Sequence, residues 1–505
     1  MRRRAGRLHA AVSAVVDVEP HETSALVHSS ASFFFVLSAY FVVLPLRDEG
    51  AISLGLSNLP ELFVGSLILT LLAAPLSTLF FAIPSLSKSK ALVLILRFFS
   101  VSLVVFFILW HLSSSPTASS SFTSKAPLSV SMGSKDFNFN QTSPAAYAPG
   151  WGDKSSGWFY ISVRIGLFLW VALLNLITIS STWARVIDVM DNESGSRLFG
   201  FIGAGATLGQ LFGSLFATAM AWLGPWLLLF AALLMELAAQ LSKGIRKDDS
   251  HLNEELTPIR VDDSNQQHEA DVLATSVEVV SPKSPASSVK PQLSAVLDGM
   301  WLVISSTYLL YVSLFLWLSA VVSSFFYFQK VTIIAETVTS SVGRRRLFAQ
   351  INSIIAAFIL AGQLTLTGRI LTVAGVTIAI CSAPVIAFLN MISIAVWPTW
   401  VAVAMCETIR KVVTYVVTRP ARELLFTVIS QEEKYKAKIC IDVVVQRLGD
   451  ATAAGMYKVL SSSLHGKTST ISLYALPVCV AWVVTAFHIG RRQEHLAKFQ
   501  TVSPS

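Results

Sequence analysis

The sequence predicts an all-α membrane protein with twelve transmembrane helices arranged as two halves of six. Of the 505 residues, 53% are hydrophobic and only 13% are charged, and the mean hydropathy is +0.62. Soluble proteins carry about 25% charged residues, so this composition is typical of a chain that crosses a bilayer several times. The four cysteines lie in apolar runs without metal-ligand spacing, and we expect no metal and no cofactor.

Twelve apolar runs are candidates for membrane spans, because a helix needs about 20 residues to cross the hydrocarbon core. The first six are expected at 25–46, 59–83, 91–111, 158–183, 198–222 and 225–241. The second six are expected at 296–328, 348–366, 370–396, 397–429, 439–464 and 469–489. The segment from 329 to Arg346 is expected to be a hydrophilic connection.

These spans predict the organisation of the chain. We expect a cytoplasmic N-terminal segment (1–24), an N-terminal half (25–242) with a disordered loop (113–156), a cytoplasmic linker (243–295), a C-terminal half (296–490) and a cytoplasmic tail (491–505). Basic residues favour the cytoplasmic side, which places the linker and the tail inside. The loop then lies outside with the glycosylation sequon at Asn140, as does the triplet Arg344–Arg346, against the usual charge bias.

The tenth span carries far more charge than a membrane helix normally tolerates. It contains Glu407, Arg410, Lys411, Arg419, Arg422 and Glu423. An ionisable group near the bilayer centre costs roughly 2.5–3.5 kcal/mol, so such groups normally face a bundle interior or a wet path. Helical spacing places Glu407, Lys411, Thr414, Tyr415, Thr418 and Arg422 on one polar stripe, and Pro420 is expected to kink or interrupt the helix.

The eleventh span repeats this pattern. Lys438, Asp442, Gln446 and Asp450 recur every four residues, with Arg447 beside the row. Two interpretations are open. The charges could form interhelical ion pairs that only lock the bundle, or they could line a cationic path for an anionic solute.

Three glycines mark the fifth span. Gly205, Gly209 and Gly213 lie one turn apart, and their spacing does not fit a dinucleotide-binding loop. Close packing of this face against another helix is the better interpretation.

Two six-helix halves joined by a long inside loop fit a major-facilitator-like 6+6 bundle with a site at the midplane between the halves. The sequence shows no histidine cluster, nucleophile elbow or paired-carboxylate motif, which argues against an enzyme. No basic tract with interleaved aromatic residues indicates nucleic acid as a partner.

Several segments resemble the ATP/ADP translocase family, the non-mitochondrial nucleotide exchangers of plastids and intracellular bacteria, together with its broader bacterial facilitator-like branch. They are Pro45–Asp48 (PLRD), Arg197–Gly205 (RLFGFIGAG), Thr418–Thr427 (TRPARELLFT) and Glu433–Lys438 (EKYKAK) followed by Asp442. The resemblance covers nearly all spans, from about Val18 to Leu464, and is closer to the broader branch.

The resemblance implies exchange of nucleotides by alternating access, with membrane cations binding the phosphates. It implies phosphate-binding roles for Arg47, where the exchangers have lysine, and for Lys436 or Lys438. The chain departs from the exchangers in two places, because its fourth span has no glutamate and Gln329 stands where they carry another. We therefore expect membrane lipid and a small anionic solute such as ATP or ADP as partners.

Taken together, the expected site has two sets of residues. Solute-binding positions are Arg47, Lys411, Arg419, Arg422, Lys436 and Lys438; coupling or ion-pair positions are Asp48, Glu407, Asp442, Arg447 and Asp450. An anion antiporter predicts that Arg47, Lys411, Arg422 and Lys438 face one cavity. A proton-coupled facilitator of another solute would use Glu407, Asp442 or Asp450, and a scaffold or receptor without transport would have fully satisfied ion pairs.

Overall fold

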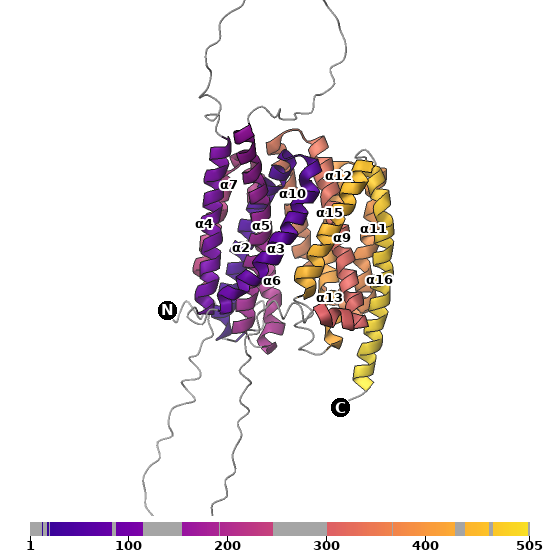
Figure 1. The fold of residues 1–505 in the computed structure, drawn as a ribbon. Coiled ribbons are helices and arrows are strands. Elements are labelled where there is room, and N and C mark those ends of the chain that lie inside the picture. The colour runs from indigo at the N-terminus through magenta and orange to yellow at the C-terminus, as the bar shows by residue number, and fades with distance from the viewer. Residues whose placement is uncertain are drawn as a thin grey trace, which may run out of the picture.

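In the computed structural model, the described part of the chain is helical and contains no strand (Figure 1). The structure describes residues 13, 18–19, 21–82, 87–114, 154–190, 192–245, 300–365, 367–429, 440–463 and 468–502. The predicted sequon at Asn140, the greater part of the 113–156 loop and of the 243–295 linker, and the two lysines at 436 and 438 lie outside these residues.

Six long helices form the N-terminal half: α2 (Glu22–Ser53), α3 (Leu59–Ala82), α4 (Lys88–Ser114), α5 (Lys154–Val189), α6 (Asn192–Ala219) and α7 (Trp226–Ser242). Apolar side chains of α2, α4, α5 and α7 pack into one core between them. Burial of this kind orders the helices relative to one another by close packing rather than by hydrophobic transfer, since lipid is as apolar as the core.

Six further segments form the C-terminal half. They are α9 (Thr307–Thr337), α10 (Ser341–Thr365), α11 (Thr367–Val396), α12 (Trp400–Val413) continued by α13 (Arg419–Leu425), α15 (Gln446–Ser463) and α16 (Thr468–Val502). A π-helical turn, Thr414–Thr418, joins α12 to α13, and a second one, Ile441–Val445, leads into α15.

The predicted fold class is confirmed. Nine of the described helices are long and apolar enough to cross a membrane, and α7 is a shorter apolar helix. Two segments do not meet the criterion: α12 and α13 are too short as separate helices, at 14 and 7 residues, and α15 carries Arg447, Asp450 and Lys458 within its 18 residues. With them the described helices make up two sets of six.

The seventh span was predicted too early in the chain. It was expected at 296–328, whereas α9 begins at Thr307 and ends at Thr337. The triplet Arg344–Arg346 lies inside α10 and not in a hydrophilic connection. The helix continues because the residues after the aromatic run are also buried. They include Lys330 and, one turn later, Ile333 and Ile334.

The helices run between two opposite ends of the bundle. Because twelve segments alternate in direction, α2 begins and α16 ends at the same end, which is the lower one in Figure 1. We call this the proximal face, and the opposite end the distal face. The predicted cytoplasmic N-terminus would make the proximal face cytoplasmic.

The two halves touch along three lines. Helix α6 packs against α10, α3 packs against α15, and the distal part of α2 reaches both α9 and α10. Four buried side chains of the first half are part of the core of the second half: Ala51, Leu59, Leu62 and Phe168. The boundary between the halves is therefore closely packed in its distal part.

The glycines of α6 pack directly on α2, as predicted. A Cβ on Gly209 would lie 2.8 Å from the Cα of Phe34, closer than real Cβ atoms approach another atom, and Gly205 and Gly213 meet the backbone of Ser30 and Ser38 in the same way. The Ser38 hydroxyl donates to the Gly209 carbonyl at 3.1 Å. Small residues let the two backbones approach this closely.

Replacing Gly209 by alanine tests this packing. We expect Gly209→Ala to destabilise the protein by about 1–3 kcal/mol, because overpacking forces the two helices apart. The matched control is Gly203→Ala on the same helix, where a Cβ would meet nothing within 4 Å. Thermal unfolding in detergent should show a lower midpoint for Gly209→Ala and an unchanged or higher one for Gly203→Ala. Equal shifts in both variants would contradict the packing argument.

Candidate functional site

One face of α12 carries a buried carboxylate between two cations. Thr399 caps the helix through its side chain, and two turns later Glu407, Arg410 and Lys411 follow at positions i, i+3 and i+4, which share a face. Glu407 accepts two hydrogen bonds from Arg410, from Nη2 at 2.6 Å and from Nε at 3.2 Å. The Lys411 ammonium lies 3.4 Å from the other carboxylate oxygen.

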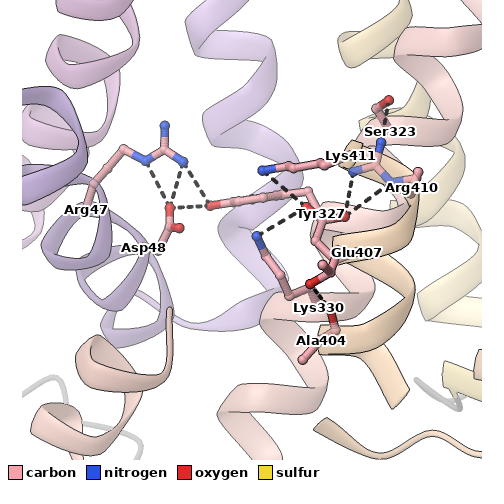
Figure 2. Close-up of polar contacts among 10 residues, drawn as sticks. Arg47, Asp48, Ser323, Tyr327, Lys330, Ala404, Glu407, Arg410 and Lys411 are labelled. Atoms are coloured by element: carbon pink, nitrogen blue, oxygen red, sulfur yellow. Dashed lines mark hydrogen bonds and ion pairs between the residues drawn. The ribbon is translucent and has the colours of Figure 1, made fainter. Parts of the chain in front are cut away.

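A third cation reaches the same carboxylate from α9. The Nζ atom of Lys330 lies 3.7 Å from Glu407, and both side chains are almost fully buried, at 6% and 3% exposed. The lysine also lies over the ring of Phe348 at 5.8 Å. Lys330 was not among the predicted site residues. We call Lys330, Glu407, Arg410 and Lys411 the Glu407 cluster (Figure 2).

The Glu407 cluster has an excess of positive charge. Among the described residues, its three cations form ion pairs with Glu407 alone. One carboxylate neutralises one of them, so two positive charges remain in a buried setting. Removing ions from water is unfavourable by several kcal/mol each, and imperfect pairing leaves part of that penalty unmet. An anion entering the cluster would offset it.

A second pair connects this cluster to the N-terminal half. Arg47 and Asp48, near the distal end of α2, form an ion pair at 2.6 Å. The Tyr327 hydroxyl of α9 donates to Asp48 at 2.9 Å, and Arg47 also packs over Phe168 at 4.8 Å. Figure 2 shows the Tyr327 side chain between the Arg47–Asp48 pair and Lys330. The predicted residues Arg47, Asp48, Glu407 and Lys411 are thus brought to one place at the boundary between the halves.

A small cavity of about 80 Å³ lies next to the cluster within the C-terminal half. Its polar lining includes Ser319, Ser323, Arg422, Gln446 and Asp450. Arg410 donates to the Ser323 hydroxyl at 3.0 Å, so this serine borders both the cavity and the Glu407 cluster.

Asp450 is held at the cavity by neighbours on two helices. It accepts a hydrogen bond from Ser324 of α9 at 2.6 Å and forms an ion pair with Arg447 at 3.3 Å. Two of the predicted coupling or ion-pair positions, Arg447 and Asp450, thus pair with each other within α15.

The single polar stripe predicted along the tenth span was wrong. Tyr415 is 37% exposed, whereas Thr418 is buried and lies 3.3 Å from Ser382 of α11. A π-helical turn holds one extra residue, which rotates the following residues by about 100° relative to an α-helix. The predicted interruption next to Pro420 is present, and it divides the stripe between different neighbours.

The remaining predicted positions do not join the cluster. Arg419 is exposed and lies over the ring of Tyr415 at 5.3 Å. Arg422 borders the cavity, which neither Arg47 nor Lys411 lines, so the structure does not bring these three to one cavity. Lys436, Lys438 and the side chain of Asp442 lie outside the described residues, although the backbone of Asp442 lies in the second π-helical turn.

The sequence reasoning also missed a set of contacts at the distal face. Glu49 of α2 forms ion pairs with Arg344 at 3.6 Å and Arg345 at 3.5 Å, both from α10. A more exposed bridge joins Glu61 of α3 to Lys458 of α15 at 2.7 Å. Each of these links connects the N-terminal half to the C-terminal half.

The chemistry of the site is that of anion binding. Lysine and arginine are the side chains that hold phosphate and carboxylate groups, arginine in bidentate fashion. In the part of the chain that the structure describes, no group of three histidine, cysteine or acidic side chains has the geometry to hold a metal ion.

Removing the central carboxylate should destabilise the fold. We expect Glu407→Ala to lower stability by roughly 3–5 kcal/mol, because it leaves the buried Lys330 and Arg410 and the partly exposed Lys411 without their counterion. The control is Glu61→Ala at the exposed distal bridge, which should lose no more than about 1 kcal/mol. Thermal unfolding in detergent compares the two. Similar small shifts in both variants would contradict the charge excess inferred for the cluster.

The described helices, two sets of six, share their fold with a solved transporter. No family model and no curated protein matches it. Among solved structures, a POT family transporter in complex with 5-aminolevulinic acid is similar with a TM-score of 0.54 and 11% sequence identity, over 93% of this chain and 96% of that one. The xylose transporter XylE from E. coli, in its inward open conformation, has a TM-score of 0.49 and 12% identity over 92% and 94% of the two chains. The nucleoside transporter NupG has a TM-score of 0.47 and 13% sequence identity, over 93% of this chain and 98% of that one. At these identities the likeness concerns the fold, and the resemblance to the ATP/ADP translocases rests on the sequence motifs.

Proposed function

We propose that this protein is a secondary transporter of small anionic solutes that works by alternating access. The observation that carries the proposal is the excess positive charge of the Glu407 cluster at the boundary between the two halves. In transporters with two internally related halves, solutes bind near the midplane at this boundary. A scaffold would be expected to pair its buried charges completely, which the cluster does not do.

The cluster also has a suitable position for a solute that touches both halves. Lys330 and Glu407 belong to the C-terminal half. Tyr327 of the same half lies between them and the Arg47–Asp48 pair of the N-terminal half, and its hydroxyl donates to Asp48. A multivalent anion between Lys330, Lys411 and Arg47 would interact with both halves at once. Because such an interaction differs between the open and closed arrangements, solute binding can drive the change between them.

Phosphorylated anions, and nucleotides of the ATP/ADP type in particular, are the leading solute class. The motifs around Arg47 and Arg422 that resemble the translocases support this, as does the preference of arginine for phosphate oxygens. The departure at Gln329 has a structural counterpart, because its side chain is buried and donates to Ser472 of α16 at 2.8 Å. The position where the exchangers carry a glutamate therefore serves helix packing in this chain. Because the chain departs from the exchangers here, we propose phosphorylated anions as a class and not ATP and ADP alone.

A proton-coupled facilitator is the second candidate, and Asp450 is the residue that favours it. Asp450 lines the cavity and has a single cationic partner in Arg447. Glu407, by contrast, has three cationic partners, and acidic side chains inside a bundle are typical members of proton relays. In this case Asp450→Asn should abolish uptake driven by a pH gradient and spare solute exchange.

Transport assays with charge-removing variants test the proposal. Proteoliposomes loaded with ADP and offered labelled ATP, followed by a panel of phosphorylated metabolites, should show uptake. We expect Lys330→Gln and Lys411→Gln to reduce it at least about tenfold, because a contact to a charged group contributes about 1.5–3 kcal/mol and 1.4 kcal/mol is a factor of ten. Lys458→Gln, at the exposed distal bridge, is the matched control and should transport normally. Unchanged uptake in the first two variants would count against the cluster as the solute site.

A further inference from the structure

One buried arginine of the N-terminal half lies apart from the Glu407 cluster. Arg164 of α5 is 7% exposed and lies between two aromatic rings, at 3.6 Å from the ring centre of Trp110 and 3.8 Å from that of Tyr160. Its Nε and Nη1 atoms are buried and have no hydrogen-bond partner among the described residues. Cation–π contacts stabilise a guanidinium but leave its N–H groups unsatisfied. Two donors of Arg164 are thus available for an acceptor.

A carboxylate of the same half lies close to this arginine. The Trp110 ring that covers Arg164 also covers Gly50, where a Cβ would lie 3.7 Å from it, and Gly50 directly follows Glu49 in α2. Glu49 is near enough to act electrostatically on Arg164, yet the structure shows no hydrogen bond or ion pair between them.

Glu49 is engaged by the other half instead. Its two carboxylate oxygens pair with Arg344 and Arg345 of α10, and Arg345 also donates to the carbonyl of Ala221 between α6 and α7 at 3.2 Å. The Glu49 side chain is only 8% exposed. These contacts join the halves at the distal face in the conformation described.

Opening of the distal face must break these pairs. Movement of α10 away from α2 would leave Glu49 as an uncompensated carboxylate in a poorly hydrated position, which is strongly unfavourable. A partner that stays in the N-terminal half would remove this penalty. Arg164 belongs to that half, has two donor atoms without a partner, and packs on the same Trp110 ring as the turn of α2 that carries Glu49.

We propose that Arg164 is the second partner of Glu49: the carboxylate pairs with Arg344 and Arg345 when the distal face is closed, and with Arg164 when it is open. This inference rests on the proposed alternating-access function. It assigns to Arg164 a positioning role, since the residue acts on the conformational equilibrium through Glu49 and not on the solute.

Distance measurements between the halves test the exchange. Spin labels are attached at Ser57→Cys and Ser462→Cys, both exposed at the distal face, in a chain whose four native cysteines are replaced by serine. Electron-resonance distances are recorded in lipid nanodiscs, with and without ATP. The wild type should show a short and a long distance, and Arg344→Gln should increase the long-distance fraction.

The decisive variants change Arg164 and Glu49 separately and together. We expect Arg164→Gln to lower the long-distance fraction at least threefold, and Arg164→Lys, which keeps the charge, to retain most of it. In a Glu49→Gln background no carboxylate is left to neutralise, so Arg164→Gln should then have no effect. A general structural role of Arg164 would lower the fraction equally in both backgrounds.

The outcomes distinguish the partner exchange of Glu49 from alternating access itself. No effect of Arg164→Gln, or an equal effect in both backgrounds, overturns the exchange of partners while leaving transport by alternating access standing. A single short distance in the wild type under all conditions overturns both. Gel filtration of each variant checks that it is monodisperse, and the Glu49→Gln/Arg164→Gln pair keeps the comparison valid if Arg164→Gln alone folds poorly.

Discussion

The contact of Glu407 with its cations is the constraint on which the central part of the structure depends. Lys330, Arg410 and Lys411 could not be brought together without a carboxylate among them, because like charges at this distance repel in a medium of low polarity. The carboxylate holds α9 and α12 in register, yet it neutralises only part of the charge. The same arrangement therefore stabilises the bundle and leaves it able to attract an anion.

Much of this could be predicted from the sequence. Most of the spans follow from hydropathy, and the spacing of Glu407 and Lys411 by four residues predicts their contact on one helix face. The glycines of α6 were correctly assigned to helix packing because small residues at one-turn intervals have few other uses in a membrane helix. Patterns within one helix were reliable since they need no knowledge of its neighbours.

What the sequence did not reveal depends on contacts between helices or on changes in helical phase. Lys330 was missed because the seventh span was ended at 328, which placed this lysine beyond the membrane although α9 continues to Thr337. Its partner Glu407 is far away in the chain. The π-helical turn at Thr414–Thr418 shifted the residues that follow it, and regular helical spacing could not anticipate such a turn. Glu49 was not among the predicted site residues either, since its partners lie in the other half.

The pairing of Glu49 with Arg344 and Arg345 has a consequence for biogenesis. With the predicted cytoplasmic N-terminus, these arginines would stand at the outside face, where positive residues oppose correct insertion. Their counterion is synthesised almost three hundred residues earlier, so it is already in place at the membrane when α10 leaves the ribosome. In that orientation, a nascent chain with its first six helices assembled would offer a carboxylate that pairs with the basic start of α10 after it crosses. Orientation of the later helices would then depend on prior folding of the earlier ones.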